Sequence, residues 1–325
     1  MITNTAERII QYITGHKEVT PRQLREYLGI GAPALFRQLK KLQIQGKITK
    51  TGSSPKVFYS LTESGLAATV DTTLPKNLAQ LIEQRWLSIS VLGQIEAGLN
   101  GFAGWCHKFK LPVAKTALEY QRILLKYDQY KKGGVLNGLP KITDTFAKVY
   151  LDELYYLDFY SIERFGKTKL GALLLYAKQS QSSELMKRLF DLVRPKIQRL
   201  IIKKKIEAVG FIPPTVQRLT QLQRELEKNL ALELPTLKIV KASGTVAVAQ
   251  KTLSKLPDRV VNAAGSIFVE SIPKGNRILL IDDAVGSGAS MNETARKIKE
   301  KNSRAHVIGL AITGSYKGFD VLNEV

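Results

Sequence analysis

Two adjacent carboxylates that directly follow a run of branched apolar residues are the feature of this sequence with the clearest chemical potential. Residues 278–281 read ILLI, and this run predicts a short strand that is buried on both faces. Asp282 and Asp283 follow at the carboxyl end of that strand. In open α/β sheets, ligands bind beyond the carboxyl ends of the strands, so both carboxylates stand where they can accept hydrogen bonds from a bound molecule.

A glycine turn and a helix follow the acidic pair. Gly286 and Gly288 allow a tight turn with positive φ, Ser290 is a favourable N-cap, and residues 292–301 predict a helix with Glu293 near its positive end. Backbone N–H groups in such a turn, together with the first N–H groups of the helix, form a concave site for a phosphate monoester. A phosphate site beside carboxylates that accept hydrogen bonds from a diol indicates a ribose 5-phosphate.

Other phosphate-binding motifs do not fit this loop. A dinucleotide-binding turn requires G-x-G-x-x-G, but Met291 stands at the third glycine position, and no Gly-Lys-Ser/Thr of a P-loop occurs here. The alternative is an ordinary strand-to-helix turn that carries two acids. That alternative is disfavoured because the apolar run, the acids, the glycines and the cap all occur in the order and spacing that a phosphate site requires.

The stretch resembles the binding motif for PRPP (5-phosphoribosyl 1-diphosphate) in type I phosphoribosyltransferases. The resemblance implies that PRPP is bound by the nine residues of the motif, Asp282, Asp283, Ala284, Val285, Gly286, Ser287, Gly288, Ala289 and Ser290. Ala284 replaces a larger aliphatic residue and Gly286 replaces Ser, Thr or Ala, whereas Ser287 and Ser290 keep hydroxyl groups. Phosphate binding relies mainly on backbone amides and should survive these changes, but the resemblance does not decide whether the site is catalytic.

The segment 149–325 is predicted to be a parallel-sheet α/β domain of the phosphoribosyltransferase type. Strand-like runs alternate in it with helical segments, and this alternation favours a parallel sheet with right-handed crossovers. The strand-like runs are 154–160, 207–212, 237–240, 266–269, 278–281 and 306–312. A crossover helix is expected over 216–230.

A second set of residues narrows the resemblance. Gln250, Leu253-Ser254, Arg259, Asn262 and Phe268 follow one another in the order found in the ComF family of phosphoribosyltransferase-like competence proteins. The cysteine-rich zinc element of many ComF proteins is missing, and so is the usual Arg-Gly-Phe-Asn after Pro214. The resemblance implies that Mg²⁺ accompanies PRPP and that pyrophosphate contacts come from Thr215, Arg218, Lys241, Lys251 and Arg259. Simple solvated surface is the alternative for these cations.

Residues 1–70 predict a winged helix-turn-helix. Three helical segments, 5–14, 21–28 and 32–45, precede two strand-like runs, 47–51 and 56–61, joined by a Gly-Ser-Ser-Pro turn. This order resembles the winged-helix regulators of bacteria and archaea. The residues expected to meet DNA are Pro33, Arg37, Gln38, Lys40 and Lys41 on the third helix, with Lys50 and Lys56 on backbone phosphates. A winged helix used for protein contacts is the alternative.

Residues 71–148 are predicted to be a helical connector. Helical spacing runs through 78–89, 95–108 and 113–131, and a basic, glycine-rich loop is expected over 131–140. The first of these helices could pack on its own domain or on a second copy, so a homodimer is an expectation. No chemistry can be assigned to this segment.

Composition and charge limit the classes of function. The chain has 325 residues, of which 44% are hydrophobic and 24% charged, as in soluble globular proteins. No apolar run approaches the ~18 residues that span a membrane, and no signal peptide is evident, so we expect a cytoplasmic protein without membrane contact. Cys106 is the single cysteine, which excludes an internal disulfide and a cysteine-based metal site. The net charge of +21 favours polyanionic partners, above all nucleic acid.

Three functions are compatible with these features. The first is a DNA-binding protein whose phosphoribosyltransferase-fold domain senses PRPP or a nucleotide, similar in plan to purine repressors and acting as a transcriptional regulator. The second is an active phosphoribosyltransferase that carries a winged helix as an accessory. The third is a ComF-like protein in DNA uptake or processing. The sequence favours the first, because only a short segment follows the last strand and no base-reading residues can be named.

Overall fold

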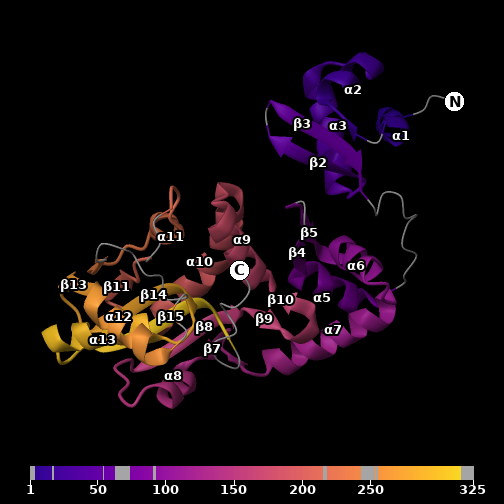
Figure 1. The fold of residues 1–325 in the computed structure, drawn as a ribbon. Coiled ribbons are helices and arrows are strands. Elements are labelled where there is room, and N and C mark those ends of the chain that lie inside the picture. Colours follow the sequence, from indigo (N-terminus) through magenta and orange to yellow (C-terminus); the bar gives the residue numbers. More distant parts are fainter. Residues whose placement is uncertain are drawn as a thin grey trace. The chain divides into compact units, whose positions relative to one another are not determined.

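The computed structural model describes residues 4–16, 18–53, 55–62, 74–90, 93–214, 218–242, 253 and 255–315. By its internal contacts the chain divides into two compact units, Met1–Gln121 and Arg122–Val325 (Figure 1).

The first unit begins with three helices and a small antiparallel sheet in strand order β1-β3-β2. The elements are α1 (Thr5–His16), β1 (Glu18–Val19), α2 (Pro21–Leu28), α3 (Ala32–Ile44), β2 (Ile48–Ser53) and β3 (Lys56–Leu61). The start of α2 is set by a capping box, in which Thr20 and Gln23 satisfy each other's backbone N–H groups, and by a proline at its first turn. Ile13, Leu24 and Leu39 are buried in one common core, in agreement with the predicted inward stripes.

The rest of the first unit is less helical than expected. It contains α5 (Lys76–Arg85), β4 (Leu87–Ile89), β5 (Ile95–Ala97), α6 (Gly98–Lys108) and most of α7 (Val113–Asp128). The predicted helices over 78–89 and 95–108 are wrong at their facing ends, because β4 and β5 pair there as an antiparallel hairpin. Trp86 adopts an extended conformation at the end of α5 and packs edge-on against Phe102 and Tyr120, which turns the chain into β4.

The second unit is a mixed α/β structure around a mostly parallel central sheet. The sheet has the strand order β11-β14-β15-β8-β7-β6, and the four strands β11, β14, β15 and β8 run parallel. These four are β8 (Glu153–Phe159), β11 (Ala208–Phe211), β14 (Arg277–Val285) and β15 (His306–Gly314). β14 and β15 are buried along almost their whole length, as the continuous apolar runs predicted.

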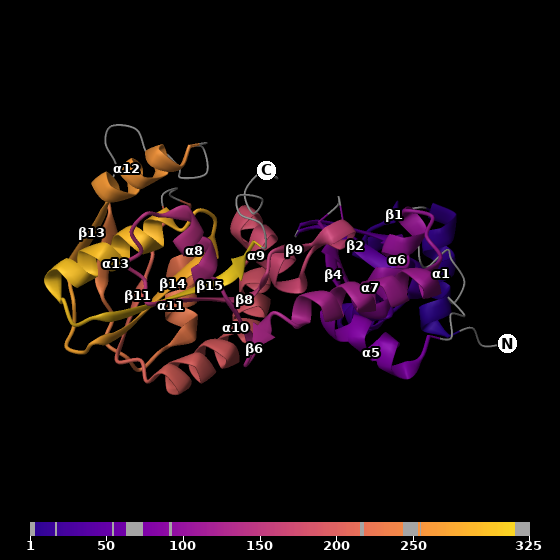
Figure 2. The same ribbon diagram turned by 90° about the horizontal axis from the view of Figure 1, so that it is seen from below.

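Helices cover both faces of this sheet. α9 (Lys169–Ser180), α10 (Ser183–Lys204) and α11 (Leu222–Leu230) pack with one another on one face. α12 (Leu256–Ser266) and α13 (Ala289–Lys301) pack together on the other face, which is nearer the viewer in Figure 2. The smaller elements are α8 (Leu139–Thr145), the 3₁₀ helix η1 (Glu163–Phe165) and the hairpin of β9 (Ser161–Ile162) and β10 (Gly166–Lys167).

Two predictions about the sheet need correction. The strand-like runs near 237–240 and 266–269 form β12 (Lys238–Lys241) and β13 (Ile267–Ser271), which pair with each other as a separate antiparallel sheet. The residues just before β12 touch the central sheet through an isolated parallel bridge between Thr236 and Val209 of β11. The basic loop expected over 131–140 contains β6 (Lys131–Lys132) and β7 (Val135–Asn137), which extend the central sheet as antiparallel strands. Short exposed edge strands carry too few apolar residues for their alternation to be read from sequence. The central sheet therefore includes residues that the sequence placed in the helical connector.

Candidate functional site

The predicted strand, acids, turn and helix are present, with one shift. β14 runs through the acidic pair to Val285, and α13 begins at Ala289, so its N-cap is Gly288 and not Ser290. Gly288 has φ 84° and ψ 0°, a left-handed conformation that glycine adopts without strain. Ser290 lies in the first turn of the helix, where its carbonyl oxygen accepts a hydrogen bond from the hydroxyl of Thr294 at 2.8 Å. Within the turn, Ser287 is buried.

Asp283 is held by a cation that no sequence motif indicated. The Nζ of Lys178, near the end of α9, donates a hydrogen bond to Oδ2 of Asp283 and forms an ion pair with it. The side chain of Asp283 is 8% exposed and that of Lys178 is 41% exposed, so the acid is the buried partner. Burial acts to lower the pKa of Lys178, but the Asp283 carboxylate outweighs it and the pKa is raised.

Asp282 is held by different groups. Its Oδ1 accepts hydrogen bonds from the backbone N–H of Asp283 at 2.7 Å and from Nε2 of Gln223 on α11 at 3.3 Å. Burial raises the pKa of Asp282 to about 7, and the neighbouring Asp283 carboxylate acts in the same direction. Burial lowers the pKa of Lys241, at the end of β12, while Asp282 acts to raise it. The sheet edge thus places Lys178 and Lys241 within electrostatic range of the acidic pair.

Asp282→Asn should raise stability above neutral pH. In the unfolded chain an aspartate titrates near pKa ~3.9, so folding raises this pKa and the folded state binds the proton more tightly. The stability of the unchanged protein should fall as the pH rises from about 4 to about 7. The Asn side chain can still accept both hydrogen bonds. In urea unfolding, the free energy of unfolding of the variant should exceed that of the unchanged protein by about 1–3 kcal/mol near pH 8. Near pH 4 the two free energies should be equal. Asp144→Asn, at an exposed acid, is the control, and a difference that does not depend on pH would contradict the assignment.

The pyrophosphate candidates fall into two groups. Arg218 donates from Nη1 to the carbonyl oxygen of Lys178, which ties the segment after β11 to the end of α9 beside the acids. Lys241 also lies in this cluster, through its electrostatic coupling to Asp282. Arg259 is 6% exposed, and its Nε donates to the carbonyl oxygen of Leu253 at 2.6 Å, within its own segment. Thr215 and Lys251 lie outside the described residues.

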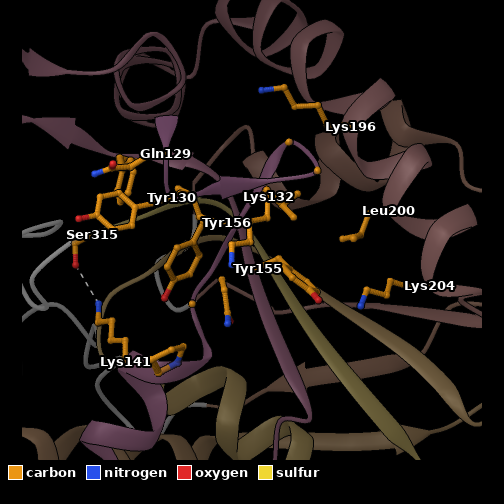
Figure 3. Close-up of a pocket in the computed structure, with 18 of the residues that line it drawn as sticks. Gln129, Tyr130, Lys132, Lys141, Tyr155, Tyr156, Lys196, Leu200, Lys204 and Ser315 are labelled. Atoms are coloured by element: carbon orange, nitrogen blue, oxygen red, sulfur yellow. Dashed lines mark hydrogen bonds between the residues drawn. The ribbon is translucent and has the colours of Figure 1, made fainter. Parts of the chain in front are cut away.

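The turn itself borders a large cavity. Gly286 and Ser287 are among the residues that line a cavity of about 900 Å³. The other lining residues come mainly from the β6–β7 hairpin, β8, α8 and α10 (Figure 3). The Nζ of Lys141 donates to Oγ of Ser315 at 3.0 Å in this cavity. Asp282 and Asp283 are not among its lining residues. The buried side chain of Ile142, on α8, packs where a Cβ of Gly288 would lie.

The residues predicted to contact DNA are accessible in the first unit. Gln38 is half-buried, and the other predicted residues are exposed on α3 and on the β2–β3 hairpin, namely Pro33, Arg37, Lys40, Lys41, Lys50 and Lys56. Phe36, which the sequence reading did not single out, is 48% exposed on α3. An exposed aromatic between cations on one helix is a surface that can contact a partner.

The described residues contain neither a group of metal ligands nor a membrane-spanning helix. In the part of the chain that the structure describes, no three His, Cys, Asp or Glu side chains come together in a way that could hold a metal ion. None of the described helices has the length and apolarity needed to cross a lipid bilayer.

Comparisons with known proteins give little guidance. No family model matches the chain, and no curated protein matches it. Among solved structures, the chain is similar to adenine phosphoribosyltransferase from Leishmania donovani, at 15% identity and a TM-score of 0.22, over 46% of this chain and 71% of that chain. At this TM-score the likeness carries no argument, and what the structure itself shows is a mixed α/β unit with a mostly parallel central sheet.

Proposed function

We propose that this protein binds DNA through an N-terminal winged helix and binds PRPP, or another ribose 5-phosphate, in a phosphoribosyltransferase-like second unit. The observation that carries the proposal is the end of β14. Two carboxylates stand there beside a turn whose left-handed Gly288 begins α13. Lys178 and Gln223 hold the carboxylates from neighbouring helices. The order of Leu253, Arg259, Asn262 and Phe268 supports a place near ComF-like proteins for this unit.

The chemistry of the site suits a sugar phosphate. Backbone amides of the turn and the N-terminus of α13 would hold the 5′-phosphate. Asp282 and Asp283 would accept hydrogen bonds from the ribose diol, and Asp282 would do so best above its pKa of about 7. Arg218, which donates a hydrogen bond to the carbonyl oxygen of Lys178, and Lys241, which is coupled to Asp282, would meet pyrophosphate. Mg²⁺ would arrive with PRPP and would neutralise pyrophosphate charge; the pyrophosphate oxygens and water suit its preference for oxygen ligands better than the protein does.

The first unit supports the DNA-binding half of the proposal. α3 presents Arg37, Lys40 and Lys41 on its exposed face, and the β2–β3 hairpin presents Lys50 and Lys56. This arrangement fits a recognition helix in a major groove with a wing on the phosphate backbone. Ala32, Pro33 and Ala34 offer few hydrogen bonds to base edges, so sequence readout should depend on a small number of side chains. A dimer would double the contact with DNA, and we keep it as part of the proposal.

DNA affinity should change when PRPP is bound. Coupling between two sites is typically worth about 1–3 kcal/mol, so PRPP with Mg²⁺ should shift the Kd for duplex DNA by about 5- to 150-fold at fixed salt. The measurement is fluorescence anisotropy with and without PRPP, beside calorimetry of PRPP alone.

Two paired variants separate the halves of the proposal. Asp282→Asn with Asp283→Asn should abolish the PRPP effect and leave the affinity for DNA without PRPP. Arg37→Glu with Lys41→Glu should weaken DNA binding and leave PRPP binding. If PRPP binds and the two DNA affinities are equal, the protein is not a PRPP-responsive regulator.

Catalysis is the second candidate. The observation that favours it is the cavity that adjoins Gly286 and Ser287, which offers space for an acceptor next to the proposed phosphate turn. A phosphoribosyltransferase would release pyrophosphate from PRPP in the presence of its acceptor, and the Asp282→Asn, Asp283→Asn protein would not. Pyrophosphate release across a panel of purine, pyrimidine and pyridine bases tests this, and no release from any base would exclude those acceptors.

A further inference from the structure

The large cavity of the second unit is strongly basic. Its lining comes from the β6–β7 hairpin, β8, α8, α10 and the turn after β14 (Figure 3). Among the described residues that line it, one is acidic, Asp144, and six are basic: Lys132, Lys141, Lys196, Arg199, Lys203 and Lys204. Lys204 is neutralised by an ion pair with Glu153, which leaves a clear excess of positive charge. We call this cavity the basic groove.

The cations of the basic groove are spread along it. Lys196, Arg199 and Lys203 lie on successive turns of α10, and the first and last are separated by roughly 10 Å along the helix at 1.5 Å per residue. Lys132 lines the groove from the hairpin, and Lys141 lines it from α8. A single phosphate cannot reach cations at this separation, whereas a chain with repeated phosphates can contact them in turn.

Aromatic side chains lie between these cations. Four aromatic residues line the groove, of which Tyr130 is 42% exposed and Tyr155 is half-buried, whereas Tyr156 and Phe159 are buried. Tyr130 and Tyr155 are therefore the rings that can meet a base. Proteins that bind single-stranded nucleic acids combine a positively charged groove with aromatic rings, because every base can stack on a ring whatever its identity. A rigid duplex would not bring its bases to such rings.

Tyr156 supplies an independent sign of a missing partner. The residue is 3% exposed, and its hydroxyl has no hydrogen-bond partner among the described residues. Figure 3 shows its ring inside the groove on the side of Lys141. An unpaired buried hydroxyl is unfavourable, so a ligand that supplies a hydrogen bond would relieve a cost that the free protein carries.

We infer that the basic groove binds single-stranded nucleic acid, with a 5′-phosphate end at Gly286 and Ser287. The turn after β14 opens into the groove, so a strand whose terminal phosphate occupied the turn would continue past Tyr156 and Lys141 toward α10. A terminal monoester fits a cradle of backbone amides better than an internal diester, because it offers three free oxygens. The placement of the 5′ end rests on the proposed phosphate site, but the groove itself does not.

The test compares oligonucleotides of about 12 nucleotides, a length within the range bound by single-strand-binding folds. Anisotropy is measured on the full chain with 5′-phosphorylated and 5′-hydroxyl strands of DNA and of RNA, each over a series of salt concentrations. We expect the phosphorylated strand to bind about 10-fold more tightly, because a charge-assisted contact is added. Equal affinity of the two strands would overturn the placement of the 5′ end.

Matched charge reversals locate the binding site. Lys196→Glu with Lys203→Glu should weaken single-strand binding at least about 10-fold and lower the slope of log affinity against log salt by about 1–2. Lys187→Glu with Lys228→Glu removes the same charge from exposed positions of the same unit outside the groove, and should have little effect. If the two double variants weaken binding equally, binding is non-specific attraction to a basic protein and the groove is not the site.

Tyr156→Phe distinguishes a ligand contact from a structural role. Removing the unpaired hydroxyl should raise the melting temperature of the free protein and weaken single-strand binding about 3- to 10-fold. A lower melting temperature with unchanged affinity would show that the hydroxyl serves the fold and would overturn its role in binding. The affinities of the same variants for duplex DNA and for PRPP should not change. A protein without a PRPP response can therefore be distinguished from a protein whose groove does not bind single strands.

Discussion

Lys178→Met is expected to lower the free energy of unfolding by about 2–4 kcal/mol near pH 8. The substitution keeps the length of the side chain but leaves the Asp283 carboxylate, which is 8% exposed, without its cation and next to Asp282. Breaking a buried ion pair from one side typically costs about 3–5 kcal/mol. We reduce that range because the lysine side chain is 41% exposed and water partly screens the pair.

The double variant Lys178→Met, Asp283→Asn shows whether the cost arises from the unpaired charge. It removes the carboxylate that was left without a cation, and in urea unfolding it should recover most of the lost stability. Lys238→Met is a matched control on an exposed pair, because Lys238 and Glu270 have side chains that are 70% and 46% exposed. That variant should stay within about 1 kcal/mol of the unchanged protein. If Lys178→Met is equally mild, Asp283 is solvated and the description of the site is wrong.

Local patterns were enough to predict the elements that carry the proposed site. The run 278–281 became part of β14, and the residues after it became a turn and a helix, because burial, a glycine and a helix start are encoded within a few neighbouring residues. The N-cap was predicted two residues late, since Ser290 is the favoured type but Gly288 satisfies the backbone geometry. In the first unit, the inward stripes of α1, α2 and α3 followed helical spacing and were predicted correctly.

Contacts between distant residues could not be predicted from local patterns. Lys178 precedes Asp283 by 105 residues and lies in a helix whose spacing indicates only packing, so no motif linked the two. The β6–β7 hairpin was missed for a related reason. Its strands are two and three residues long, and they are stabilised by pairing, β7 with β8 and β6 with β7, rather than by their own composition. The basic groove depends on both that hairpin and α10, and therefore appears only in the folded structure.

Gly288→Ala should lower stability by about 2–4 kcal/mol and abolish phosphate binding, as judged by urea unfolding and by calorimetry with PRPP. An alanine in the left-handed conformation costs about 1–2 kcal/mol. The added methyl group would also overlap the side chain of Ile142, which is fully buried and has little room to move, and overpacking typically costs about 1–3 kcal/mol. Both effects displace the turn whose amides would hold the phosphate.

Gly265→Ala is the matched control for this change, and Ile142→Val separates its two causes. Apart from its chain neighbours and the backbone of its own helix, no described atom lies within 4 Å of the position that a Cβ of Gly265 would take. The helix, α12, should gain about 0.5–1 kcal/mol from alanine. Adding Ile142→Val to Gly288→Ala should relieve the overlap and recover part of the stability, but phosphate binding should stay lost, because the left-handed strain persists. If Gly288→Ala is as stable as Gly265→Ala and still binds PRPP, the turn after β14 does not act as a rigid phosphate cradle, and the proposed sugar-phosphate site has no structural basis.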